Sequence, residues 1–477
     1  MLLRNARVGG AVVDIRVDGG VIAEIGRDLG TGGLGTGGLD LDGLFVTPGL
    51  WDEHVHFSQW ALTSKRLDVS SAGSAREVAA LVGDALASAP EGVTFVAQGF
   101  RDGLWPDAPN LPDLDAVAGR RPVVIISADL HAAWLNSAAL ALYGHEHSTT
   151  GLLREEPAFD VTRRVGEIPE ALLDAWVAEA AQAAAARGVV GVVDLEMGWN
   201  LDTWRRRMGA GFDSLRVEFG VYRQHLDRAI ALGLRTGQSV SGLLSVGRFK
   251  ILTDGSLNTR TAYCAAHYPG QPGQHGLLEV DPSELQQLVG RANAAGIESS
   301  VHAIGDAANT VALDAFEAVG CGGRIEHAQL VSEPDFARFA ALGVVASVQP
   351  EHAMDDRDVA DRYWHGWTDR AYAWRRFLDA GATLAFGSDA PVAPLDPWVT
   401  MAAAVGRARD GREAWMPEQR LDVADAIAAS TRSTVEVGQP ADLVVTGLDP
   451  AAVGHEQLRS MPVAATLCAG QLTYSSI

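Results

Sequence analysis

The chain has 477 residues, of which 47% are hydrophobic and 21% are charged, a composition typical of a globular protein and not of a disordered one. It carries 38 Lys and Arg against 60 Asp and Glu, which gives a formal net charge of −22. Because a surface this acidic repels phosphate backbones and no basic run interrupts it, we expect no nucleic-acid partner.

Cysteine usage and apolar runs bear on the compartment. Cys264, Cys321 and Cys468 lie far apart and form no CxxC pair, which excludes a disulfide scaffold and a thiolate zinc site. The N-terminal segment lacks the charged stretch and apolar core of a signal peptide. No run of about 18 apolar residues occurs anywhere. We therefore expect a cytoplasmic protein that does not bind membranes.

Residues 1–46 alternate apolar and polar positions, which predicts short strands joined by glycine turns. The segment GTGGLGTGGL (30–39) contains a formal GxGxxG pattern. A dinucleotide-binding loop of this kind needs a helix directly after it, but the strand-like sequence LDLDGLFVTPGL follows. We interpret the segment as an expanded hairpin loop, which argues against a nicotinamide-dependent oxidoreductase.

Further along the chain, apolar β-branched runs alternate with Ala-rich stretches that have helical character, for example 169–188 and 282–296. Eight runs could be strands of one sheet: 44–56, 189–196, 215–221, 248–255, 297–305, 324–329, 344–352 and 383–390. Eight β–α alternations at this chain length predict an α/β protein with a parallel (β/α)8 barrel of the TIM type.

Two segments fall outside the alternation. Strand-like runs at 93–99 and 121–130 predict an inserted subdomain of about 65–165 after the first barrel strand. Short strands return near the end of the chain. The predicted domains are therefore a barrel over 47–436 and a small β-sandwich built from both termini, 1–46 plus 437–477.

His54 and His56, in WDEHVH, stand two residues apart at the end of the first predicted barrel strand. Alternate residues of a strand point to the same side, so both imidazoles could bind one metal ion. The pattern alone is weak evidence, because the chain contains a second pair, His145 and His147, in a polar stretch that is typical of a loop.

Other potential ligands occupy the same position on other strands. Lys250, His302, His327 and Asp389 each lie at or near the carboxyl end of an apolar run, where barrel active sites are built. Taken singly, each has an ordinary explanation: an exposed lysine at a strand edge, a core histidine or a helix cap. The four together, each on a different strand, favour a metal site.

These motifs, in order, resemble the amidohydrolase superfamily: WDEHVH after TPGL, Lys250 on the fourth strand, HAIGD, RIEHAQ, SVQPEH and GSDAPV. DLHAAWLNSAAL (129–140), DGSLNTRTA (254–262) and HAIGDAANTVALDAFE (302–317) resemble the amidohydrolase family 3 branch, which includes N-substituted formamide deformylase. One departure is Asn258–Thr259, where the branch more often has Gly-Ser.

The resemblance implies a pair of metal ions. His54, His56 and Asp389 would hold one ion and His302 and His327 the other, with carboxylated Lys250 bridging them. Imidazole and carboxylate ligands suit Zn²⁺. Mn²⁺ and Fe²⁺ remain alternatives, as does a single ion with an unmodified Lys250.

We expect hydrolysis of an amide-type C–N bond in a small molecule, N-formyl or N-acyl, with Asp389 as general base and acid and His352 as oxyanion donor. Candidate substrate-binding residues are His131, Trp134, Asp254 and Arg260. The aromatic stretch 361–374 either walls the pocket or packs helices.

Alternatives of two kinds remain open. The same site could support a deaminase, a lactonase or an isomerase, because function depends on the pocket and not on the fold. A catalytically inactive binding protein is the other alternative, although all six ligand positions are filled. A small-molecule substrate is the expected partner, and a homodimer is left open.

Overall fold

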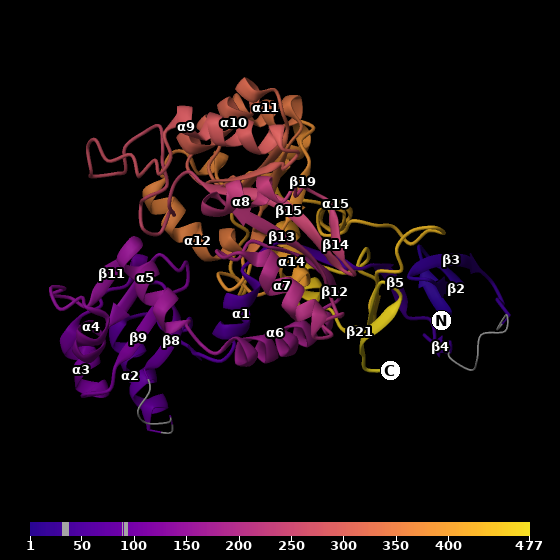
Figure 1. The fold of residues 1–477 in the computed structure, drawn as a ribbon, viewed down its shortest axis with the longest axis horizontal. Helices are drawn as coiled ribbons and strands as arrows, with labels where there is room; N and C mark the ends of the chain where they lie inside the picture. Colours follow the sequence, from indigo (N-terminus) through magenta and orange to yellow (C-terminus); the bar gives the residue numbers. More distant parts are fainter. Residues whose placement is uncertain (31–37, 88, 90–93) are drawn as a thin grey trace.

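The computed structural model describes residues 1–30, 38–87, 89 and 94–477. Most of the predicted hairpin loop at 30–39 lies outside the described residues. Figure 1 shows the barrel between two smaller parts: the insertion in purple on one side, and a sheet of indigo and yellow strands from the two termini on the other.

Eight parallel strands build the barrel. In chain order they are β6 (Leu50–Val55), β12 (Val189–Asp194), β13 (Arg216–Tyr222), β15 (Leu244–Leu252), β16 (Ser299–Ala303), β17 (Gly323–His327), β18 (Val344–Val348) and β19 (Leu384–Phe386). Neighbours in sequence are neighbours in the sheet. The ring nearly closes between its ends, where Asp389 N donates to His54 O (2.7 Å) and His56 N to Ala390 O (2.8 Å). The predicted parallel barrel is confirmed.

Helices cover the outside of the barrel. They are α1 (Phe57–Thr63), α6 (Glu170–Ala185), α7 (Asn200–Gly209), α8 (Leu226–Ala231), α9 (Pro282–Ala294), α10 (Asp306–Val319), α11 (Asp335–Leu342), α12 (Pro350–Tyr363), α13 (Trp374–Asp379), α14 (Pro397–Gly406), α15 (Val423–Ala429) and α16 (His455–Arg459). A short strand, β14 (Ser239–Ser241), pairs with β15. The strands bury nearly all their side chains, as expected for a sheet covered by helices.

The insertion follows α1 and contains its own sheet, in the order β11-β10-β9-β8-β7. Its elements are β7 (Leu67–Asp68), α2 (Ala75–Leu86), β8 (Phe95–Phe100), α3 (Leu111–Ala118), β9 (Val123–Ser127), β10 (Ala132–Leu135), α4 (Ser137–Tyr143), β11 (Leu152–Arg154) and α5 (Glu156–Val165). Three of its helices begin at side chains that suit helix starts: Ser74 accepts from Glu77 N, Asn110 from Asp113 N and Asn136 from Ala139 N.

Strands from both termini share one sheet. They are β1 (Leu2–Val8), β2 (Ala11–Asp18), β3 (Val21–Gly26), β4 (Gly38–Asp40), β5 (Phe45–Pro48), β20 (Leu443–Thr446), β21 (Val463–Cys468) and β22 (Gln471–Ser475). Among the described residues these eight strands form a single sheet, so a two-sheet sandwich is not seen. The domain boundaries stay a prediction.

The predicted first barrel strand, 44–56, is in fact two strands. β5 pairs with β20 in the terminal sheet, whereas β6 pairs with β12 in the barrel. Gly49 lies between them, where a Cβ would come within 2.5 Å of Val190 Cγ1. The chain can therefore pass from one sheet to the other only with a glycine at this position.

A network of buried and half-buried charged side chains connects β6, β17 and β13. Glu53 of β6 accepts from Arg324 of β17 (2.9 Å) and from Arg432 (2.6 Å). Arg432 also reaches Glu218 of β13 (2.8 Å) and covers the ring of Trp51 at 3.8 Å. Burial alone would raise the pKa of Glu53, but the two guanidiniums lower it to about 2.

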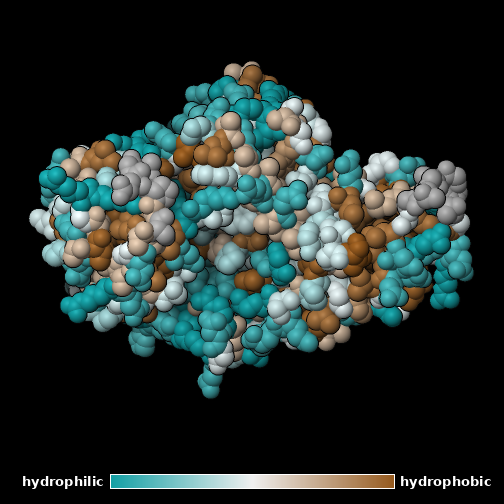
Figure 2. All heavy atoms as spheres, turned by 90° about the horizontal axis from the view of Figure 1, so that it is seen from below, coloured by the Kyte–Doolittle hydropathy of each residue, from teal (hydrophilic) through white to brown (hydrophobic). Residues whose placement is uncertain are grey.

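The mixture of hydrophilic and apolar side chains on the surface agrees with the globular composition of the chain. In the view of Figure 2, hydrophilic side chains interrupt the apolar ones over the whole face. Among the described helices, none combines the length and the apolar character that crossing a bilayer requires.

Candidate metal centre

One cavity of about 310 Å³ opens at the carboxyl ends of the barrel strands. Six of the sequence-predicted residues line it together: His54, His56, Lys250, His302, His327 and Asp389. They come from β6 and the residue directly after it, from β15, β16 and β17, and from the segment after β19, so the barrel brings together side chains that are up to 335 residues apart. This is the end of a parallel barrel where catalytic groups are found.

Asp389 is at the centre of the cluster. One carboxylate oxygen lies 3.4 Å from His54 Nε2 and 3.4 Å from His56 Nε2, and the other lies 4.0 Å from His327 Nδ1. Two ligands about 2.1 Å from one tetrahedral ion would be about 3.4 Å apart. Potential ligand atoms of His54, His327 and Asp389 all lie within 4.8 Å of one another. The spacing therefore fits a divalent cation held between these side chains.

Two of the imidazoles are oriented by neighbours outside the cluster. His54 Nδ1 lies 2.7 Å from Glu326 Oε2, and His327 Nδ1 lies 2.8 Å from Gln349 Oε1. A partner on Nδ1 leaves Nε2 as the free ligand atom. Neither Glu326 nor Gln349 was among the predicted site residues. The sequence does contain a sign of the role of Glu326: it is an acidic residue inside the buried run RIEHAQ, and a buried carboxylate needs a hydrogen-bond or charge partner.

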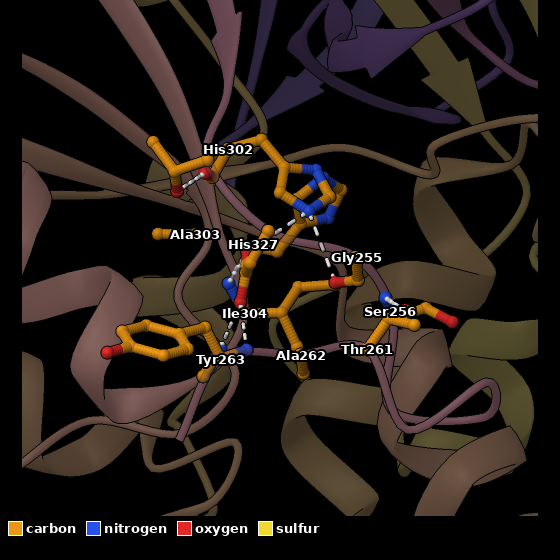
Figure 3. A network of polar contacts seen from close by, with 12 residues as sticks. Gly255, Ser256, Thr261, Ala262, Tyr263, His302, Ala303, Ile304 and His327 are labelled. Carbon is orange, nitrogen blue, oxygen red and sulfur yellow. Dashed lines mark hydrogen bonds and ion pairs between the residues drawn. The ribbon is translucent and has the colours of Figure 1, made fainter. Parts of the chain in front are cut away.

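His302 and His327 stand side by side at the ends of β16 and β17, with ring centroids 4.4 Å apart (Figure 3). Burial lowers the pKa of both imidazoles well below the usual range. Both are therefore neutral, which is the form that binds a metal.

Lys250 is only 2% exposed. Within the described part of the chain, its ammonium has no hydrogen-bond or ion-pair partner, although Glu326 and Asp389 act on it electrostatically. Burial lowers the pKa of its amine, against the opposing effect of these two carboxylates. An amine in this setting is available for carboxylation.

His352 also lines the cavity, but it is not at the end of a strand. β18 ends at Val348, and Pro350 begins α12, so His352 lies in the first turn of that helix. Its Nε2 is buried, has no hydrogen-bond partner among the described residues, and lies 4.0 Å from an Asp389 oxygen. An unpaired buried nitrogen facing the cluster can bind a substrate oxygen.

The predicted substrate-binding residues differ in whether they line the cavity. His131 lines the cavity. Trp134 does not: it is fully buried in the core of the insertion, and its indole donates to Asn110 O (3.2 Å). Its predicted substrate contact is corrected to packing, because side chains alternate along β10 and Trp134 faces the insertion's own core.

Asp254 and Arg260 have other contacts in the structure, and their role in substrate binding stays a prediction. Asp254 accepts from the backbone N–H groups of Tyr263, Ile304 and Gly305 at 2.8–3.0 Å and so fixes the loop beneath His302. Arg260 lies over the ring of Tyr363 at 5.5 Å. Neither side chain lines the cavity.

The aromatic stretch 361–374 serves packing. Trp364 and Trp374 are almost completely buried in the barrel core, and Trp367 packs against it. None of the stretch's aromatic side chains lines the cavity. His145 and His147 lie on a loop of the insertion, outside the cavity.

A parallel barrel with imidazole and carboxylate groups gathered at its carboxyl end is the arrangement of a metal-binding enzyme site. The family follows from sequence comparison: residues 38–474 match the amidohydrolase family, and the chain belongs to it. It is therefore an enzyme of the metal-dependent amidohydrolase type.

Three similar proteins illustrate the relationship. The protein LONG AFTER FAR-RED 3 of Arabidopsis thaliana is 31% identical over 435 residues, 83% of this chain and 74% of that protein. N-substituted formamide deformylase of Arthrobacter pascens is 27% identical over 522 residues, 96% and 94% of the two chains. The crystal structure of an uncharacterized metal-dependent hydrolase from Pyrococcus horikoshii OT3 has a TM-score of 0.79 at 25% identity and covers 95% of this chain and 99% of that one.

Proposed function

We propose that this amidohydrolase cleaves the C–N bond of a small amide, with N-formyl and N-acyl amines as the favoured substrates. The observation that carries the proposal is the gathering of six potential ligands, Asp389 and five others, in one cavity. The likeness to a formamide deformylase supports the N-formyl class.

The ligands suit Zn²⁺, and they would divide into His54, His56 and Asp389 for one ion and His302 and His327 for a second. A bound cation would supply Lewis-acid chemistry and a lowered pKa of water. With a single ion, Lys250 stays unmodified.

The lysine content favours carboxylation of Lys250. The sequence has only two lysines, Lys65 and Lys250, and the other 36 of its 38 basic residues are arginine. A guanidinium cannot form a stable carbamate with CO₂, but a neutral primary amine can. The cavity thus contains the one basic residue type that this chemistry requires.

Asp389 is placed to move the proton. Water adds to the amide carbon, the C–N bond breaks, and the water's proton passes through the Asp389 carboxylate to the leaving nitrogen. Burial would raise the pKa of Asp389, but His54 and the hydrogen bond from His56 outweigh burial and lower the pKa well below its usual range. The carboxylate is therefore ionised at rest, which is the form that a proton acceptor requires.

The remaining lining explains how a substrate would be held. His352 can donate from Nε2 to the carbonyl oxygen as negative charge develops there. Apolar side chains from the insertion and from the loops after the barrel strands line much of the rest: Phe100, Leu104, Leu130, Phe159, Met197 and Val392.

The test is a substrate panel on Zn²⁺-loaded enzyme: N-formyl amines, N-acyl amines, cyclic amides, lactones and amino-purines, assayed beside Asp389→Asn. We expect turnover of N-formyl or N-acyl amines and a loss of kcat of at least a thousandfold in the variant. Turnover of lactones or amino-purines alone would replace amide hydrolysis by lactonase or deaminase activity. Unchanged kcat in the variant would refute the role of Asp389.

A further inference from the structure

The insertion contributes an imidazole to the cavity wall. His131 Nδ1 lies 2.8 Å from Glu155 Oε2, and its ring packs edge-on against Phe159 with centroids 5.3 Å apart. With Nδ1 committed to Glu155, Nε2 is the nitrogen left to face the cavity that His131 lines. In the described residues Nε2 has no protein partner.

Glu155 holds an unusual backbone conformation to make this contact. It precedes α5 at the N-cap position with φ 52°, yet its side chain caps no helix N–H. A non-glycine residue with a positive φ is strained. The carboxylate is used instead on His131 and on Thr261, whose hydroxyl donates to Glu155 Oε1 at 3.2 Å.

A second carboxylate fixes the same turn. Asp129 Oδ1 accepts from His131 N (3.2 Å), and Oδ2 accepts from Asn258 Nδ2 (3.1 Å) and Ser256 Oγ (3.3 Å). Asn258 and Thr261 both belong to the loop after β15, which begins directly after the strand that carries Lys250. The position of the His131 ring is therefore set from the insertion and from the barrel together.

We propose that His131, held by Glu155, is a catalytic residue that donates a hydrogen bond from Nε2 to an oxygen of the bound substrate, so that the insertion completes the active site. The proposal rests on the amide hydrolysis proposed above. It assigns Glu155 as a positioning residue that acts only through His131.

The surroundings favour the donating form. Burial lowers the pKa of His131, but the hydrogen bond that its ring donates to Glu155 and the charge of Asp129 outweigh burial, and the net shift of the pKa is upward. A protonated ring gives one N–H to Glu155 and directs the other into the cavity.

A double-mutant cycle tests the pair, using the best substrate of the panel. We expect His131→Gln to lower kcat/KM about a hundredfold, the scale for losing an oxyanion donor, with metal content unchanged. Glu155→Ala should lower it at least tenfold in the wild-type background and have no further effect in the His131→Gln background. Glu156→Ala removes an exposed neighbouring carboxylate and is the matched control, with kcat/KM within twofold of wild type.

Two results would overturn the proposal. One is a His131→Gln variant with kcat/KM within twofold of wild type. The other is a double variant whose loss of kcat/KM equals the product of the losses in His131→Gln and Glu155→Ala, because Glu155 would then have a structural role of its own. Glu155→Gln, which keeps an acceptor for Nδ1–H, should fall between wild type and Glu155→Ala.

Imidazole NMR separates failure of this proposal from failure of the proposed function, because it needs no turnover. With ¹⁵N-histidine protein and His131→Gln for assignment, we expect the doubly protonated ring of His131 to persist to a higher pH in the wild type than in Glu155→Ala. A bare Nε2 in the wild-type protein would refute the donor role, whatever the substrate is.

Discussion

Substituting Glu326 by Gln tests the support behind the metal ligands. Glu326 Oε2 lies 2.7 Å from His54 Nδ1, both side chains are 1% exposed, and Ser300 Oγ donates to the other carboxylate oxygen. Glu326→Gln keeps an acceptor of nearly the same shape but removes the charge that makes His54 a better ligand. Loss of such a partner typically lowers metal affinity about 10- to 100-fold, which is about 1.4 to 2.8 kcal/mol.

The assay is a Zn²⁺ competition titration against a chelator of known affinity, with circular dichroism to confirm folding. Glu333→Gln makes the same change in net charge at a side chain that is 72% exposed, pairs with Arg376 and does not line the cavity, and it should leave the affinity unchanged. A Zn²⁺ affinity of Glu326→Gln within twofold of wild type would refute the reasoning that this carboxylate supports His54.

Three further substitutions have separate consequences. Arg324→Met leaves the buried carboxylate of Glu53 with one guanidinium fewer, so the free energy of unfolding should fall by about 3–5 kcal/mol in denaturant titrations; a change under about 1 kcal/mol would contradict the pairing. Trp134→Ala should destabilise the protein by about 3–5 kcal/mol without a specific rise in KM, and a raised KM at unchanged stability would restore its role in substrate binding. His352→Ala should lower kcat about a hundredfold with little change in metal content, whereas loss of metal would make His352 a ligand.

The barrel was predictable because its strands are buried on both faces and read as apolar β-branched runs. The division of 44–56 between two sheets was not predictable, since TPGL contains no turn that separates the two strands. The need for a glycine at position 49 comes from contact with Val190, which is 141 positions later in the chain. The position of His352 could have been predicted, because Pro350 is a typical first residue of a helix.

The ligand set was predictable for a similar reason. Side chains at the carboxyl ends of parallel barrel strands lie at the same end of the barrel, whatever conformation the loops adopt. The identity of the residues that support these ligands was harder to predict, because it depends on which strands are neighbours and on the local backbone conformation. His327 has φ 74°, which breaks the alternation of side chains at the end of β17, and Glu326 beside it reaches His54. Glu155 was missed because its partner, His131, is fixed by the insertion's own sheet.

Metal content by plasma mass spectrometry tests the central claim most directly, on Zn²⁺-reconstituted wild type, Lys250→Ala and Lys65→Ala. Lys65 is the only other lysine of the chain and pairs with Glu179 away from the cluster. The account predicts about two equivalents in the wild type and in Lys65→Ala, and a clear loss in Lys250→Ala. One equivalent that Lys250→Ala does not change would leave a single-ion enzyme with an unmodified lysine. A wild-type protein that retains no metal after reconstitution would contradict the account as a whole.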